Sequence, residues 1–167
     1  SYTKIIPSEN KIIGYTTRYS RGKLVNFKNY FVIIFDKPFI QSNVWNDSTK
    51  LDLLEKAGNH TGAIINFKIN KNGERVHAKV ASSFISFEQA EQNLKEIGND
   101  SFETTKQKAK NIWNKTLHSI EVEGGTIDQV RTFYSTMYRT LFFPMKLYEK
   151  DKDGNIVHYS PYNGKVM

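Results

Sequence analysis

Two glutamates with one residue between them, Glu121 and Glu123, are the first candidates for chemistry. Alternate residues of a strand point to one face. Their carboxylates would therefore share a side, and glycoside cleavage uses carboxyl pairs roughly 5–10 Å apart. The same spacing is typical of the solvated face of a half-buried strand, and the sequence favours this second interpretation. We therefore assign neither glutamate a catalytic role.

The acidic run Asp151-Lys152-Asp153-Gly154-Asn155 is the second candidate, because carboxylate and amide oxygens are calcium ligands. An EF-hand loop needs glycine at its sixth position and glutamate at its twelfth. Here glycine is fourth and no glutamate follows at the twelfth position. Asp-Gly between Leu147–Glu149 and Ile156–Tyr159 instead predicts a hairpin turn. The chain has no cysteine and four separated histidines, His60, His77, His118 and His158, so the sequence predicts no metal site made by this chain.

Flat aromatic side chains are the third candidates, because pyranose rings can stack on them. Trp45 lies in an expected strand, and Tyr162 lies in the loop Pro161-Tyr162-Asn163-Gly164. Loops carry binding residues more often than cores do. For Trp45 the sequence favours a core position over a sugar contact, whereas for Tyr162 and Asn163 it leaves both interpretations open.

The first half of the chain has the pattern of strands and turns that would position these residues. Phe27–Phe35 is the strongest strand, and Arg21-Gly22 is expected to interrupt the chain before it. Asn72-Gly73 between Ala63–Ile69 and Arg75–Phe84 predicts a hairpin. About six such strands without a helix between them predict an antiparallel sandwich or barrel.

Helices follow. Ser86 is the expected N-cap of the first, with Gln89 as its capping-box partner, and a second helix is expected from about Phe102 to Leu117. Thr126 and Gln129 then predict a capping box for a third helix. This helix has an apolar face that we expect to be buried, formed by Val130, Phe133, Tyr134, Met137 and Leu141.

The charge of the chain does not indicate a nucleic-acid partner. Of its 167 residues, 24 are Lys or Arg and 17 are Asp or Glu, a net charge of +7. The whole excess lies in residues 1–85, which carry 13 basic and 6 acidic residues. These basic residues are spread along strands, as on solvated faces, and are not clustered as in a phosphate-binding patch. No run approaches the roughly 20 apolar residues of a membrane span, and Ser1–Lys4 lacks the start of a signal peptide.

Three segments in the same order resemble glycoside hydrolase family 92, the bacterial α-mannosidases. The central one is Glu121-Val122-Glu123-Gly124-Gly125-Thr126 with Gln129 and Arg131–Arg139. Upstream, Ala81–Ser86 with Glu88–Ala90 and Asn93-Leu94 is similar to the family's strand-to-helix segment. Downstream, Ser160–Val166 is similar to the segment that precedes the family's first catalytic-domain motif.

The resemblance implies an α+β chain that forms part of a larger enzyme. Residues 1–85 would be a portion of an antiparallel β-sandwich and residues 86–118 linker helices. Residues 119–167 would hold a connecting strand at Ile120–Val122 and the first helix of an incomplete (α/α)6 barrel.

The resemblance also implies an inverting, calcium-dependent exo-α-mannosidase that acts on mannose-containing glycans and is secreted, periplasmic or on the outer surface. Its catalytic residues and calcium ligands would lie outside this chain, so the fragment alone would be inactive. Tyr162, Asn163 and Trp45 are the expected substrate-binding residues. A non-catalytic carbohydrate-binding β-sandwich is the alternative.

Overall fold

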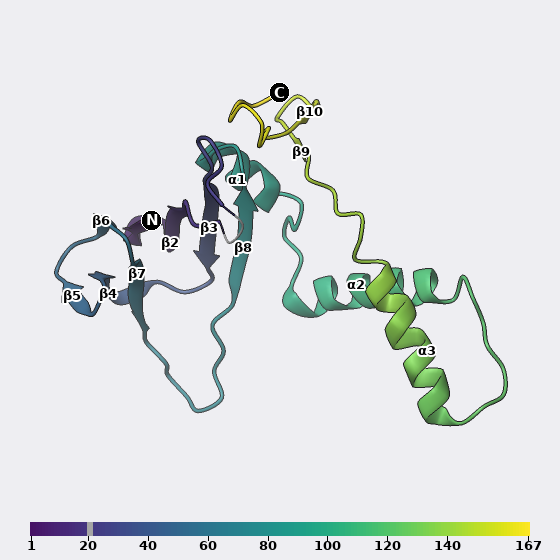
Figure 1. Ribbon diagram of the computed structural model, residues 1–167. Helices are drawn as coiled ribbons and strands as arrows, with labels where there is room; N and C mark the ends of the chain where they lie inside the picture. The colour runs from purple at the N-terminus through teal and green to yellow at the C-terminus, as the bar shows by residue number, and fades with distance from the viewer. Residues whose placement is uncertain (20–21) are drawn as a thin grey trace. The chain divides into compact units, whose positions relative to one another are not determined.

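The computed structural model describes residues 1–19 and 22–167, which form two compact units. Residues 1–98 and 148–167 make the first unit, and residues 99–147 make the second. Two β-sheets and one helix dominate the first unit, and two helices make up most of the second (Figure 1).

The larger sheet is antiparallel and has the strand order β6-β1-β2-β3-β8. Its strands are β1 (Tyr2–Ile6), β2 (Lys11–Thr16), β3 (Asn29–Phe35), β6 (Glu55–Ala57) and β8 (Ala78–Ser83). The expected strand at Phe27–Phe35 is therefore confirmed, and it lies inside the sheet between β2 and β8. Arg21 of the expected break lies outside the described residues, and β2 ends at Thr16.

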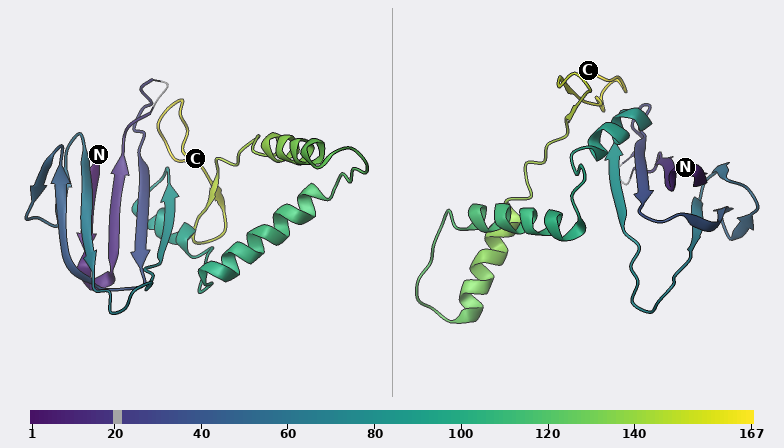
Figure 2. Two further views of the ribbon diagram at one scale, coloured as in Figure 1. Left: turned by 90° about the horizontal axis from the view of Figure 1, so that it is seen from below. Right: turned by 180° about the vertical axis from the view of Figure 1, so that it is seen from behind.

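A smaller antiparallel sheet faces this one and has the order β5-β4-β7. It is formed by β4 (Phe39–Asn46), β5 (Thr49–Leu51) and β7 (Thr61–Phe67). Ile5 and Ile12 of one sheet pack with Val44 of the other in the apolar core, and Phe31, Ile33 and Ile65 pack around them. The left panel of Figure 2 shows the strands of both sheets from below. The structure thus confirms the expected α+β chain with sandwich-like antiparallel sheets.

The predicted hairpin across Asn72-Gly73 is wrong. The turn is present, since Glu74 N–H donates to Lys71 O at 3.2 Å and Gly73 has φ +80°. The two strands that it joins, however, do not pair: β7 pairs with β4, and β8 pairs with β3 (Figure 1). The turn therefore connects the two sheets, because each strand finds an apolar partner elsewhere in the sequence.

The first helix, α1 (Phe87–Leu94), covers the outer face of the larger sheet. Its Phe87 ring contacts Tyr30 at 4.9 Å between centroids and Tyr2 and Tyr15 at 6.3 Å. Ser86 Oγ caps the helix by accepting the N–H of Gln89, as predicted. The Gln89 side chain does not return to the cap, because it donates to Asn93 and to the backbone of Lys150. Helix α1 therefore belongs to the same compact unit as the two sheets.

The second unit contains α2 (Phe102–Leu117) and α3 (Ile127–Thr140), both at their expected positions. Thr126 and Gln129 form the predicted capping box, with bonds of 3.3 Å and 2.8 Å. The predicted strand at Ile120–Val122 is wrong: this segment is irregular, because residues 99–147 contain no other strand with which it could pair.

The apolar face of α3 is also less buried than predicted. Val130, Phe133, Tyr134 and Met137 are half-buried, and Leu141 is 43% exposed. Within residues 99–147, α2 is the only helix that can cover α3. Its Trp113 ring packs on Tyr138 of α3 and on Phe142, which follows α3.

The last two strands are β9 (Glu149–Lys150) and β10 (Ile156–Val157). They pair with each other and confirm the hairpin predicted around Gly154. A second hairpin follows, in which Tyr159 pairs with Val166. No helix among the described residues is long and apolar enough to cross a membrane.

Candidate functional site

A pocket of ≈ 480 Å³ lies beside β7, at the edge of the smaller sheet, and includes Trp45. Trp45 is half-buried on β4, directly opposite Gly62 of β7. Its ring lies so close to Gly62 that a Cβ there would be 2.6 Å from three ring atoms. Gly62 therefore lets the indole fold over β7. The other apolar or aromatic residues of the pocket are Tyr2, Ile12, Tyr15, Phe31, Ile33 and Ala63.

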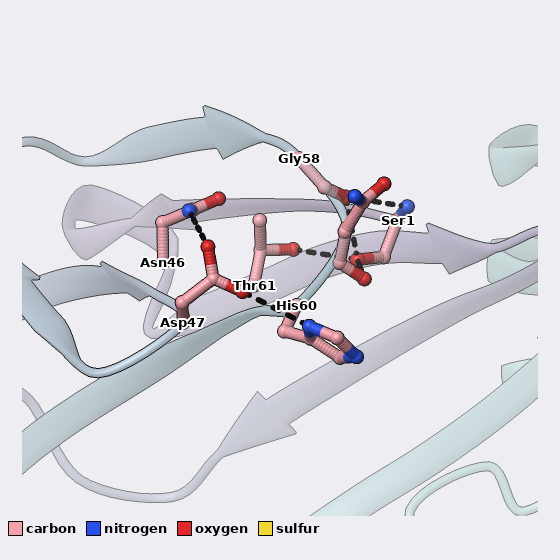
Figure 3. A network of polar contacts seen from close by, with 7 residues as sticks. Ser1, Asn46, Asp47, Gly58, His60 and Thr61 are labelled. Atoms are coloured by element: carbon pink, nitrogen blue, oxygen red, sulfur yellow. Dashed lines mark hydrogen bonds and ion pairs between the residues drawn. The ribbon is translucent and has the colours of Figure 1, made fainter.

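Polar side chains also line this pocket, among them those of Ser1, His60 and Thr61. Figure 3 shows the polar contacts that these three residues make with one another and with Asp47. His60 Nδ1 is 2.9 Å from Asp47 Oδ1, and Asn46 Nδ2 donates to the other oxygen of Asp47 at 2.6 Å. Thr61 Oγ1 donates to Ser1 Oγ at 3.2 Å. Asp47 thus contacts one ring nitrogen of His60, whose side chain is 70% exposed. An aromatic face beside hydroxyl and amide groups can bind a polyhydroxyl compound, and the cationic side chain of Arg18 also lines this pocket.

Tyr162 and Asn163 lie elsewhere, in the tip of the second C-terminal hairpin. The Tyr162 side chain is 94% exposed. Asn163 Oδ1 accepts the backbone N–H of Lys165 at 2.9 Å, which helps to close the turn. Neither residue lines the Trp45 pocket, so the structure does not bring the three expected sugar-binding residues into one site.

Glu121 and Glu123 lie on the irregular segment before α3, and both are exposed. The alternation that would place them on one strand face is absent, because no strand forms there. Their side chains therefore do not form the fixed carboxylate pair that glycoside cleavage needs.

The acidic turn at Asp151 is organised by its own hydrogen bonds. Asp151 Oδ1 accepts the N–H groups of Asp153 at 2.9 Å and Asn155 at 2.8 Å, and Oδ2 accepts the Asn155 amide at 3.0 Å. These bonds, above all that from the Asn155 side chain, hold the pKa of Asp151 below its usual 3.8. The carboxylate is thus used as a turn acceptor. In the described part of the chain no three His, Cys, Asp or Glu side chains gather as a metal site.

The sequence did not point to His60 and Asp47. The two lie 13 positions apart and meet because β4 and β7 pair in the register that places Asn46 opposite Thr61. That register follows from the pairing of β7 with β4, which the predicted hairpin of β7 with β8 had excluded.

Comparisons with known proteins place both halves of the chain in one family. A model of the glycosyl hydrolase family 92 N-terminal domain matches residues 1–83, and a model of the family 92 catalytic domain matches residues 89–167. A search of curated proteins finds no match.

Solved structures agree with these matches. A family GH92 inverting mannosidase from Bacteroides thetaiotaomicron VPI-5482 is 41% identical, with a TM-score of 0.91 over 99% of this chain and 22% of that chain. A family GH92 alpha-mannosidase from Bacteroides thetaiotaomicron is 23% identical, with a TM-score of 0.71 over 93% of this chain and 22% of that one. The structure of the same alpha-mannosidase in complex with mannoimidazole is 24% identical, with a TM-score of 0.67 over 93% of this chain and 21% of that one.

The two alpha-mannosidase structures share the fold at low identity, whereas the inverting mannosidase is similar in sequence along almost the whole of this chain. The chain spans less than a quarter of the length of each. Because one family model matches residues 1–83, the other matches residues 89–167, and this structural match covers both, the chain belongs to glycoside hydrolase family 92 and is a partial chain of such a protein.

Proposed function

We propose that this chain is part of an inverting exo-α-mannosidase that removes mannose from mannose-containing glycans. The observation that carries the proposal is the 41% identity, over 99% of this chain, to an inverting mannosidase. In this enzyme, residues 1–98 and 148–167 supply a folded sheet unit and residues 99–147 supply helices.

The acid and base of the reaction lie outside residues 1–167 in this proposal. An inverting glycosidase needs two carboxyl groups roughly 6.5–9.5 Å apart, so that a water molecule fits between one of them and the sugar. The exposed Glu121 and Glu123 have no fixed geometry of this kind. We also propose that the enzyme depends on calcium held by residues outside this chain, and that the fragment alone is inactive.

Tyr162, Asn163 and Trp45 remain our candidates for sugar contacts. The exposure of the Tyr162 ring supports a sugar contact in its loop, and the pocket beside Trp45 supports a separate contact there. We further propose a secreted, periplasmic or outer-surface location for the enzyme, which cell fractionation with an antibody against this segment would test.

Release of mannose from α-linked mannobioses by the full-length enzyme, with and without a calcium chelator, tests the main proposal. We expect release that stops when calcium is removed and returns when it is added. The first product seen by NMR should be the β-anomer, since inversion changes the configuration. A folded full-length enzyme that releases no mannose would contradict the proposal.

A carbohydrate-binding module without catalysis is the second candidate, and the Trp45 pocket is the observation that favours it. It predicts that residues 1–167 alone bind mannose, and that Trp45→Ala abolishes binding while Trp113→Ala does not. Trp113 is the matched control because it packs within the helical unit, on Tyr138 at 4.5 Å.

A further inference from the structure

The loop that carries Tyr162 is closed by its own backbone. Gly164 N–H donates to Ser160 O at 2.8 Å, and Ser160 N–H donates to Lys165 O at 2.8 Å. One step further out, His158 and Met167 exchange two bonds of 2.9 Å. Because the Tyr162 ring is 94% exposed, its burial contributes little to holding this shape. The loop is therefore organised while it presents an aromatic ring to its surroundings.

The same loop is fixed to the segment before β3. Tyr159 Oη donates to Val25 O at 2.5 Å, and its ring packs edge-on against Phe27 at 5.9 Å between centroids. Gly164 lies against Val25 so closely that a Cβ at this position would be 2.6 Å from Val25 O. These contacts join positions more than 130 residues apart in the chain.

A second anchor holds the hairpin of β9 and β10, which leads into the loop. The Glu149 carboxylate accepts Phe84 N–H at 2.9 Å and Asn93 Nδ2 at 2.7 Å. Gln89, only 8% exposed, donates to Lys150 O at 2.6 Å. A carboxylate that accepts two such bonds ties the hairpin at once to the end of β8 and to α1.

We propose that Glu149 and Tyr159 are positioning residues, which fix the Ser160–Lys165 loop on the sheet unit so that Tyr162 and Asn163 meet the sugar in one place. The inference rests on the proposed sugar contacts of Tyr162 and Asn163. On this account the sheet unit has a part in substrate recognition, because it sets the position of a loop that lies within the catalytic-domain match.

The test uses the full-length enzyme and the variants Tyr159→Phe and Glu149→Gln. Tyr159→Phe removes the bond to Val25 and keeps the ring on Phe27, whereas Glu149→Gln replaces one acceptor oxygen with a donor. Tyr134→Phe is the matched control, since it removes another tyrosine-to-carbonyl bond, to Ile120 O at 3.2 Å, in the helical unit. The readouts are amide hydrogen exchange of residues 158–167 without substrate, and KM and kcat on α-linked mannobioses.

We expect faster exchange at Ser160 and Gly164 in both variants and not in the control. KM should rise about two- to tenfold, the worth of one net hydrogen bond, with a smaller change in kcat. Adding Tyr162→Ala to Tyr159→Phe should raise KM less than Tyr162→Ala does alone, because the loop no longer holds the ring in place.

Unchanged exchange in both variants would overturn the inference whatever the kinetics. The inference would also be overturned if Tyr162→Ala raises KM but the two positioning variants show faster exchange and an unchanged KM. If Tyr162→Ala itself leaves KM unchanged, the proposed sugar contact fails, and with it the positioning of substrate. Because exchange is measured without substrate, the two failures can be told apart.

Discussion

Replacing Gly62 by alanine tests whether the Trp45 indole rests directly on β7. The new Cβ would lie 2.6 Å from Cε2, Cζ2 and Nε1 of Trp45, and ordinary contact begins near 3.4 Å. The ring must therefore move by almost 1 Å, and overpacking of this kind costs about 1–3 kcal/mol. Alanine in place of glycine in a strand returns about 0.5–1 kcal/mol, because glycine loses more freedom on folding. The net loss in the free energy of unfolding should be about 1 kcal/mol.

The same substitution in a Trp45→Ala background should change sign. Without the indole the clash is gone, and only the gain of about 0.5–1 kcal/mol from replacing glycine remains. Urea unfolding of residues 1–167, followed by far-UV circular dichroism, would give all four free energies of this cycle. We expect a coupling of about 1.5–2 kcal/mol, in the range measured for side chains in contact. If Gly62→Ala has the same effect in both backgrounds, the indole does not rest on Gly62.

Three further predictions concern the core, acid stability and a helix cap. Val44→Ala should lower the free energy of unfolding by about 2–3 kcal/mol, because Val44 is 0% exposed, whereas Val80→Ala, at a side chain 55% exposed, should change it by less than about 0.5 kcal/mol in the same urea titration. The hydrogen bond from Lys37 is the chief reason why the pKa of Glu74 lies below its usual 4.5. The ionised carboxylate therefore stabilises the fold fully above the unfolded pKa, and this contribution is lost as the pH falls through the folded pKa. We expect Glu74→Gln to flatten the decrease in the free energy of unfolding below about pH 4.5. Thr126→Ala removes the bond that Thr126 Oγ1 accepts from the Gln129 N–H and should weaken α3 by about 1 kcal/mol, seen as reduced helical dichroism and faster exchange at the Gln129 amide; unchanged exchange there would contradict the assignment of the cap.

Local signals in the sequence predicted the elements of this fold well. Ser86 and Thr126 cap the helices that they were expected to cap, and the apolar run ending at Phe35 is an interior strand. These features depend on residues within a few positions of one another. The false hairpin across Asn72-Gly73 has a different origin, because the turn forms locally while strand pairing is decided by apolar faces far away in the chain. The segment Ile120–Val122 likewise has the alternating pattern of a strand, but residues 99–147 contain no strand with which it could pair.

The candidate site was predicted only in part. Trp45 and Tyr162 could be chosen from the sequence as flat rings near turns, and the structure places one in a pocket and the other at an exposed hairpin tip. Their separation could not be predicted, nor could the pairing of His60 with Asp47, since both depend on which strands pair and in what register.

The chain leaves the sheet unit at Gly98 and re-enters it at Tyr148, and Ile97 and Tyr148 line the same pocket of ≈ 300 Å³. Exit and entry are thus neighbours, so the helical segment has the topology of a domain insertion. A short glycine-serine bridge from Gly98 to Tyr148 could replace it at a small entropic cost of closure, and would yield a minimal sheet module for crystallisation and ligand screening. A cut placed between residues 83 and 89, where the two family models divide the chain, would instead separate the sheet from the helix that covers it.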